Sequence, residues 1–159
     1  MMKTFLVAGV LLALTGTPVQ QMPPPAAVLP SAAAVPSTGT DNLIIYRAHA
    51  EPTAWSPAIK VDGIKIVGLS NRHYTSTRVA TGRHMVTVAW PGISGQDDVG
   101  MEVRIEGQEA HYLEVTGMSR VDHWSYKTVY IRMASGIAEV SPDYARQAIA
   151  TCCKFKAPK

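Results

Sequence analysis

The sequence has few of the features that mark common functional classes. Of its 159 residues only two are Cys and 17% are charged, and 15 Lys and Arg against 12 Asp and Glu leave a formal net charge of +3. Two thiols are too few for a disulfide framework or a four-thiolate zinc site, and so small a charge does not indicate nucleic-acid binding. No apolar run approaches the roughly 20 residues that a membrane-spanning helix needs. The 47% of hydrophobic residues still allow one folded domain.

Residues 1–21 have the pattern of an export signal. A short positively charged leader precedes a nearly continuous apolar stretch at residues 4–14. That stretch is too short to cross a bilayer but has the length of a signal-peptide core. We expect cleavage after Thr15 or farther on, towards Gln21. Thr17 stands where a lipoprotein signal carries the Cys that receives the lipid, so we expect a periplasmic or secreted protein without a lipid anchor.

Two further segments follow the signal. Residues 22–40 contain five Pro among Ala, Ser and Thr and offer little large apolar surface, which predicts a disordered, semi-rigid linker. Residues 41–159 have the sequence pattern of a folded domain, because short apolar or alternating runs are separated by turn residues. This pattern predicts an all-β domain, an antiparallel β-sandwich of the immunoglobulin-like or prealbumin-like kind with seven or eight strands. The expected strands are residues 42–48, 58–61, 65–69, 74–79, 83–90, 101–106, 110–115 and 126–133.

Particular residues refine this expectation. The first run is apolar almost throughout and predicts a central strand, and the alternation around Val86, Val88 and Trp90 places these three in the core. The dipeptide Asp62-Gly63 predicts a tight hairpin turn. Residues 116–123 are interpreted as a polar connection. Turns or close backbone approaches are also expected at Gly68, Gly82 and Gly107.

The C-terminal region predicts a short helix. Ser141 is a suitable N-cap and Pro142 a suitable first helical residue, and residues 144–150 are mostly good helix formers. About two turns are expected, with Tyr144 and Ala148 on the buried side together with Ala145 or Ile149.

The side chains that could carry chemistry form no recognised motif. The five His are far apart in sequence, and His84 and His111 could approach one another only if their strands were neighbours. Asp97 and Asp98 are an acidic loop pair of the kind that binds a cation only with further oxygen ligands. No nucleophile elbow or phosphate loop is present, so no cofactor is expected.

The loop aromatics and the Cys pair leave alternatives open. Trp55, Trp90, Trp124 and Tyr126 lie in or beside loops, as a glycan or peptide platform would need, although a small sandwich also needs aromatics for its core, where Trp90 is expected. Cys152 and Cys153 are adjacent, and in an oxidising compartment they could pair with other chains, close a strained ring with each other, or stay buried and reduced. The first alternative would give a disulfide-linked homo-oligomer.

Several short motifs resemble a known family. They are Tyr46-Arg47 at the end of the first strand, Val61-Asp62-Gly63 followed by Val67-Gly68, Thr81-Gly82-Arg83-His84 before a strand, and Gly107 with Tyr112-Leu113 in another strand. Over about residues 42–141 the pattern resembles small bacterial envelope proteins, often lipoproteins, of a domain of unknown function (the DUF2846-type group). The layout is also similar to PEGA and carboxypeptidase-regulatory modules. Thr81 departs from the family's usual Pro, and the lipid-anchor Cys is missing. The resemblance implies an accessory β-sandwich and no catalytic residue.

The sequence thus favours a binding or structural module of the cell envelope that is not an enzyme. The expected partner is an envelope protein or assembly, contacted through edge strands and the loops at one end. Nucleic acid is not expected as a partner, nor a transmembrane helix once the signal is removed. The alternative is a small-ligand or metal-binding protein or enzyme, with a site near His84, His111 and the Asp97-Asp98 loop.

Overall fold

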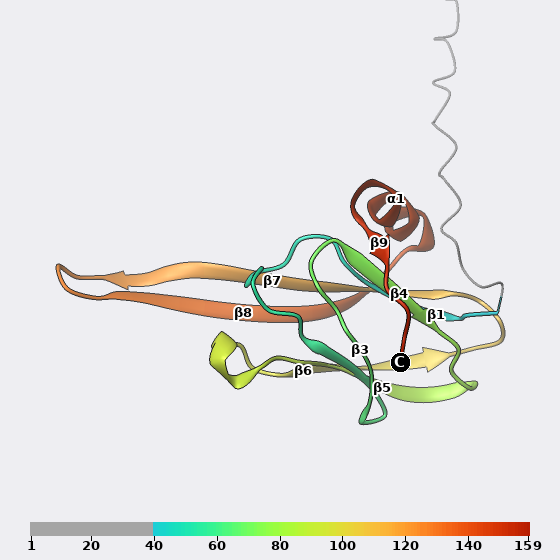
Figure 1. The fold of residues 1–159 in the computed structure, drawn as a ribbon. Coiled ribbons are helices and arrows are strands. Elements are labelled where there is room, and N and C mark those ends of the chain that lie inside the picture. Colours follow the sequence, from blue (N-terminus) through green and yellow to red (C-terminus); the bar gives the residue numbers. More distant parts are fainter. Residues whose placement is uncertain (1–39) are drawn as a thin grey trace, which may run out of the picture. The chain divides into compact units, whose positions relative to one another are not determined.

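The computed structural model describes residues 40–159 (Figure 1). The predicted signal peptide of residues 1–21 and all but the last residue of the predicted linker of residues 22–40 lie outside this part of the chain. The described elements are, in order, β1 (Leu43–Arg47), β2 (Ala58–Val61), β3 (Ile64–Gly68), β4 (His73–Thr77), β5 (Gly82–Ala89), the 3₁₀ helix η1 (Gly92–Ser94), β6 (Val99–Ile105), β7 (His111–Trp124), β8 (Val129–Val140), α1 (Pro142–Cys152) and β9 (Lys154–Phe155).

The strands form two sheets, as the all-β prediction requires. One sheet has the order β8-β7-β1-β4-β9 and the other the order β3-β2-β5-β6. The expectation of purely antiparallel pairing is wrong, because β1 pairs with β7 and β4 with β9 in parallel. A parallel pair needs a long crossover between its strands. Between β1 and β7 the chain forms β2 and β3 of the second sheet, returns to the first sheet as β4, and then forms β5 and β6 of the second sheet.

One hydrophobic cluster joins the two sheets. Leu43 and Ile45 of β1 lie in it together with Val86 and Val88 of β5. Trp90 joins the same cluster, 6% exposed, so the prediction for this run of β5 is confirmed. Each fully buried aliphatic side chain of this kind stabilises the fold by roughly 1.5–3 kcal/mol relative to an exposed one.

A second cluster covers the other side of β1. Ile44 and Tyr46 pack there with Ala145 and Ile149 of α1. Because β1 is buried on both sides, its sequence is apolar almost throughout, as expected for a central strand. Helix α1 is longer than the expected two turns, and Tyr144 is 54% exposed, so its predicted burial is wrong.

The β2–β3 hairpin turns at the predicted dipeptide. Asp62 has φ 51° and Gly63 has φ 82°, the left-handed pair that a two-residue hairpin turn requires. Gly82 and Gly107 also have positive φ, in keeping with the turns expected there. Gly68 instead closes β3 without a positive φ.

The largest departure from the sequence analysis is the β7–β8 hairpin. Residues 116–123, expected to be a polar connection, are strand and belong to β7, and β8 continues through Gly136 to Val140. The two strands pair from Tyr112 with Val140 to Trp124 with Val129. In Figure 1 they run well beyond the rest of both sheets. We call the projecting part, residues 118–134, the arm.

The short strand β9 was not expected. Lys154–Phe155 lies parallel to β4 and puts the ring of Phe155 5.3 Å from that of Tyr74. No described helix has the length and apolar character needed to cross a membrane.

Candidate functional site

The arm has one apolar side, which continues the core. Val115 and Ile137 face each other across the two strands, and both pack in or against the core cluster between the sheets. Alternate residues of a strand share a side, so the same side continues outward along both strands. We call this the apolar side of the arm, and it consists of Val121, Trp124, Val129, Ile131 and Met133.

The apolar side is open to solvent. Trp124 is 76% exposed, Ile131 55%, Val121 53% and Val129 48%. The four-stranded sheet, which covers this side over the core, contacts β8 through β6. Farther out, no described residue covers it. A contiguous apolar surface of this kind commonly marks an interaction site.

A β-bulge completes this side. The register shifts between Val121 and His123, so that Asp122 is an extra residue in β7. Without the shift Trp124 would share the side of Arg120, because side chains alternate with a period of two. The bulge instead places Trp124 opposite Val129 on the apolar side.

The opposite side of the arm carries charge. Arg120 and Arg132 are directly opposite each other, and Asp122 lies between the two guanidinium groups. Its carboxylate is 2.9 Å from Arg132 Nη2 and 3.9 Å from Arg120 Nη2. Beyond them His123 lies against Tyr130, with ring centres 6.1 Å apart. The charge of the paired strands of the arm therefore lies on this side, which also carries the exposed Met118 (64%) and Tyr130 (59%), and the apolar side has none.

The arm also has a free edge. β8 is the last strand of its sheet, and no other described strand pairs with its outer side. The strand has twelve residues and no Pro, and the bulge lies in β7. Natural edge strands are usually short, bulged or interrupted by Pro, because an open edge can pair with another chain.

Two loops hold the base of the arm. Gly117 O accepts a hydrogen bond from Glu51 N at 3.0 Å. Gln96 Nε2 donates to Glu51 O at 3.1 Å and to Ala134 O at 3.4 Å. Ser135 Oγ donates to Asp97 O at 3.3 Å. The direction of the arm is thus fixed by the loops that follow β1 and β5.

Arg47 organises the first of these loops. Its guanidinium is buried and donates to four main-chain carbonyl oxygens at 2.7–3.1 Å, those of Ala50, Pro52, Trp55 and Leu69. Burial lowers the pKa of Arg47 to about 10, and the nearby Glu51 opposes that change. The side chain therefore remains charged at neutral pH. A planar donor with several N–H groups is suited to gather several carbonyls in this way.

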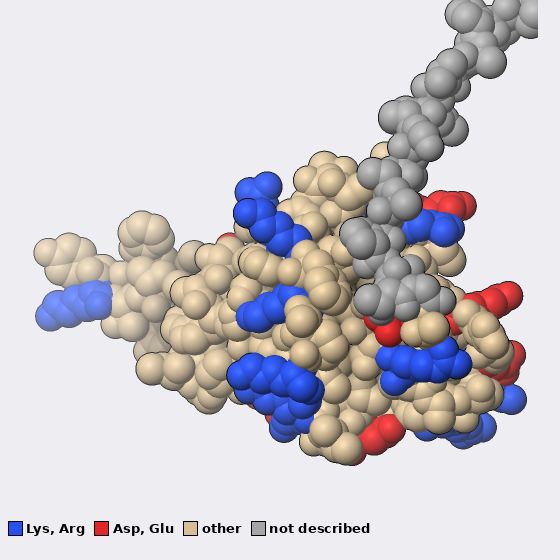
Figure 2. Space-filling view, turned by 45° about the vertical axis from the view of Figure 1, so that its right-hand side comes forward, with Lys and Arg blue, Asp and Glu red and all other residues tan. Residues whose placement is uncertain are grey.

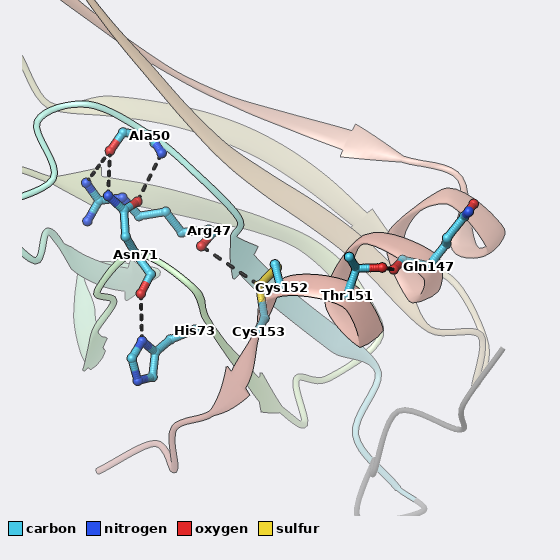
Figure 3. Close-up of a disulfide and its surroundings, with 8 residues drawn as sticks. All are labelled: Arg47, Ala50, Asn71, His73, Gln147, Thr151, Cys152 and Cys153. Atoms are coloured by element: carbon cyan, nitrogen blue, oxygen red, sulfur yellow. Dashed lines mark hydrogen bonds between the residues drawn. A yellow bond between two sulfur atoms is a disulfide. The ribbon is translucent and has the colours of Figure 1, made fainter.

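The two Cys residues lie at the end of α1, next to Arg47 (Figure 3). The structure joins them to each other in a disulfide. Of the three alternatives considered from the sequence, this is the ring closed between the two adjacent residues. Cys153 Sγ is 3.9 Å from Arg47 O. Cys152 borders an open cavity of about 390 Å³ that is also lined by Asn71, Arg72, His73 and Lys154.

The His and Asp residues of the alternative site have separate partners. His84 Nδ1 lies 2.7 Å from Asp62 Oδ2, and the hydrogen bond between them raises the pKa of His84 and lowers that of Asp62. His111 Nδ1 lies 2.7 Å from Glu139 Oε1. The strands of the two His residues, β5 and β7, belong to different sheets and are not neighbours, so the structure does not meet the condition for their approach.

The acidic loop pair has structural contacts. Asp98 Oδ1 accepts a hydrogen bond from Trp90 N at 2.8 Å, and Asp97 accepts one through its main-chain oxygen. Among residues 40–159 no three His, Cys, Asp or Glu side chains are grouped as a metal ion would need.

Comparison of the chain with protein-family models, curated proteins and solved structures gives no match. The interpretation of the site therefore depends on its geometry. Sequence reasoning identified Trp124 and Tyr126 as loop aromatics but missed the arm that carries them. The alternation of Val129, Ile131 and Met133 was a usable signal, whereas the bulge at Asp122 hides the matching alternation in β7.

Proposed function

We propose that this protein is an exported envelope module, built as a β-sandwich of the immunoglobulin-like or prealbumin-like kind, that binds a partner and catalyses no reaction. The observation that carries the proposal is the apolar side of the arm. Val121, Trp124 and Ile131 are exposed there on a two-stranded ribbon, and large apolar and aromatic side chains of this kind dominate binding energy at interfaces.

The charge distribution on one face favours this role over nucleic-acid binding. On the face shown in Figure 2 the basic side chains are spread out, with acidic side chains among them, and they do not form a single patch. A nucleic-acid site would gather Lys and Arg on one face.

Export is supported by the N-terminal sequence. A charged leader, an apolar stretch of signal-peptide length and a Pro-rich linker precede the folded part. The resemblance to small envelope proteins supports the same compartment. Edman sequencing or mass spectrometry of the protein recovered from a periplasmic or secreted fraction tests it, and an intact residue Met1 in a cytoplasmic fraction would contradict export.

Crosslinking in cells tests the binding function. A photo-reactive amino acid at Val121 should give covalent adducts with a protein partner, because this position lies in the middle of the apolar side. The matched control is Ile64, an equally apolar residue of β3 that is 71% exposed on the other sheet. Adducts from both positions alike, or from neither, would contradict a binding role for the arm.

A further inference from the structure

The shape and chemistry of the arm indicate what covers it. We infer that the partner of its apolar side is a second copy of this chain, bound by packing arm against arm around a two-fold axis. This inference depends on the proposed binding function and names the partner at the same surface.

The first argument is that the apolar side is self-complementary. A two-fold interface brings the same surface of both copies together, so a surface that is apolar throughout is complementary to itself, whereas a charge near the axis would face the same charge of the other copy. Here the charged residues Arg120, Asp122 and Arg132 are on the opposite side of the ribbon, where Asp122 already forms ion pairs with both Arg residues. The side that would be buried carries only Val, Ile, Trp and Met with the small Ser119, whose cross-strand partner is Met133.

The second argument is the layer that is missing. Over the core, the four-stranded sheet packs against this side of β7 and β8, with β6 as the nearest strand. Along the arm the same side has no such layer among the described residues. A second two-stranded ribbon has the right form to supply it, because two sheets with apolar inner sides pack face to face at a spacing of about 10 Å.

The third argument is the area. With Trp124 near the tip, the apolar side exposes apolar surface on the order of 500 Å² per copy, or about 1,000 Å² for two copies, the low end for specific association. Antiparallel arms would also bring each tip towards the other copy's loop after β5, where Ile93 is 81% exposed. The expected result is a reversible dimer with a dissociation constant of roughly 1–100 µM.

A matched pair of substitutions tests the inference. Ile131 and Tyr130 are neighbours on β8, 55% and 59% exposed, and they lie on opposite sides of the arm. Sedimentation equilibrium of the full chain should show a monomer–dimer equilibrium that Ile131→Lys weakens at least about tenfold. Tyr130→Lys, which adds the same charge to the other side, should leave the dimer unchanged. Trp124→Ser should act like Ile131→Lys, and its position near the tip keeps it clear of the folded body.

Several results would overturn the inference. A wild-type chain that remains monomeric at about 0.5 mM excludes a dimer of the expected strength, and equal effects of Ile131→Lys and Tyr130→Lys exclude packing through the apolar side. Binding of the monomer to anionic phosphatidylglycerol vesicles, lost in Ile131→Lys, would assign the side to a lipid surface instead. If the chain is monomeric but Val121 crosslinks to another protein, only the choice of partner fails and the binding function stands.

Discussion

The guanidinium carbon of Arg47 lies 4.9 Å from the centre of the Trp90 ring, so a buried cation is stacked on an aromatic side chain of the core. The same guanidinium gathers four carbonyl oxygens from the loop after β1 and from Leu69. That loop in turn bonds to Gly117 at the base of the arm. Arg47 therefore connects the core of the domain with the segment that directs the arm.

This connection predicts a large effect of Arg47→Met. The substitution keeps the apolar bulk but removes the Arg47 donor from four carbonyl groups, of which Ala50 O keeps a second donor, Asn71 Nδ2 at 3.0 Å. The loss should lower the free energy of unfolding by about 3 kcal/mol. Arg47→Lys should lower the free energy of unfolding by less than Arg47→Met does. It should still be less stable than the wild type, because an ammonium group cannot reproduce the planar fork of the guanidinium. Urea unfolding of the full chain measures both.

The control for this prediction is Arg83→Met. Arg83 is an exposed residue of β5 that pairs with Glu102 at 3.5 Å, and pairs of this kind contribute about 0–1 kcal/mol. Equal losses at positions 47 and 83 would show that the carbonyl cluster adds no particular stability.

The pair Asp62 and His84 predicts a pH dependence. The pKa of His84 is raised above its ordinary 6.5, chiefly by the hydrogen bond that its ring donates to Asp62, so its contribution to stability is complete below about pH 6.5 and is lost as the pH rises through the raised value. The pKa of Asp62 is lowered from 3.8, so its contribution is present above that pH and is lost as the pH falls through the lowered value. The pair should stabilise most between about pH 4 and pH 6.5.

Asp62→Asn tests this directly. Asn also tolerates the positive φ of position 62, so the turn should survive while the charge is removed. We expect the NMR titration of His84 to move to lower pH and the stability profile to flatten over the acidic range. Asp143→Asn replaces an exposed carboxylate of α1 and should leave the titration of His84 unchanged. A His84 titration that is identical in wild type and Asp62→Asn would exclude this coupling.

A strand could be predicted from the sequence where the burial of one of its sides produces a pattern of apolar residues. Val86 and Val88 of β5 and the following Trp90 are buried and alternate with the half-buried Thr87 and Ala89, because one side of this run faces the core. Asp62-Gly63 is required by its turn angles. In the arm only β8 has such a pattern, because Val129, Ile131 and Met133 alternate with Tyr130 and Arg132, whereas the bulge at Asp122 interrupts the alternation in β7. The strands of the arm are held by pairing with each other, and neither side is buried by the described chain.

The candidate site on the arm could not be predicted either, because the arm is not buried by the rest of the described chain and because its strand β7 contains a bulge. The bulge at Asp122 changes which residues share a side, so a fixed period of two cannot place Trp124 beside Val121. The parallel pairing of β1 with β7 and of β4 with β9 likewise depends on contacts between segments far apart in sequence, for which local patterns give no signal.

Gly117 predicts a second stability effect, at the base of the arm. A Cβ atom at this position would overlap the carbonyl oxygen of Glu51, which is main chain and cannot rotate away. Gly117→Ala should therefore force the loop from the strand and lower the free energy of unfolding by about 1–3 kcal/mol. Gly68→Ala is the control, because a Cβ there meets nothing within 4 Å, and its effect should stay within about 1 kcal/mol. Indistinguishable unfolding curves for wild type and Gly117→Ala would show that the loop yields freely.

The last prediction concerns Cys152 and Cys153, which the structure joins in a disulfide. Denatured, unreduced protein should show no free thiol, and reduction should release two, measured by reaction with a thiol reagent. A disulfide between adjacent residues closes the smallest loop that a chain allows, so the Cys152→Ser/Cys153→Ser variant should lose only about 1 kcal/mol of stability. Non-reducing denaturing electrophoresis should give a monomer for wild type and variant alike, since the arm dimer has no covalent link. A wild-type dimer band that disappears on reduction and is missing from the variant would instead assign these residues to a bridge between chains.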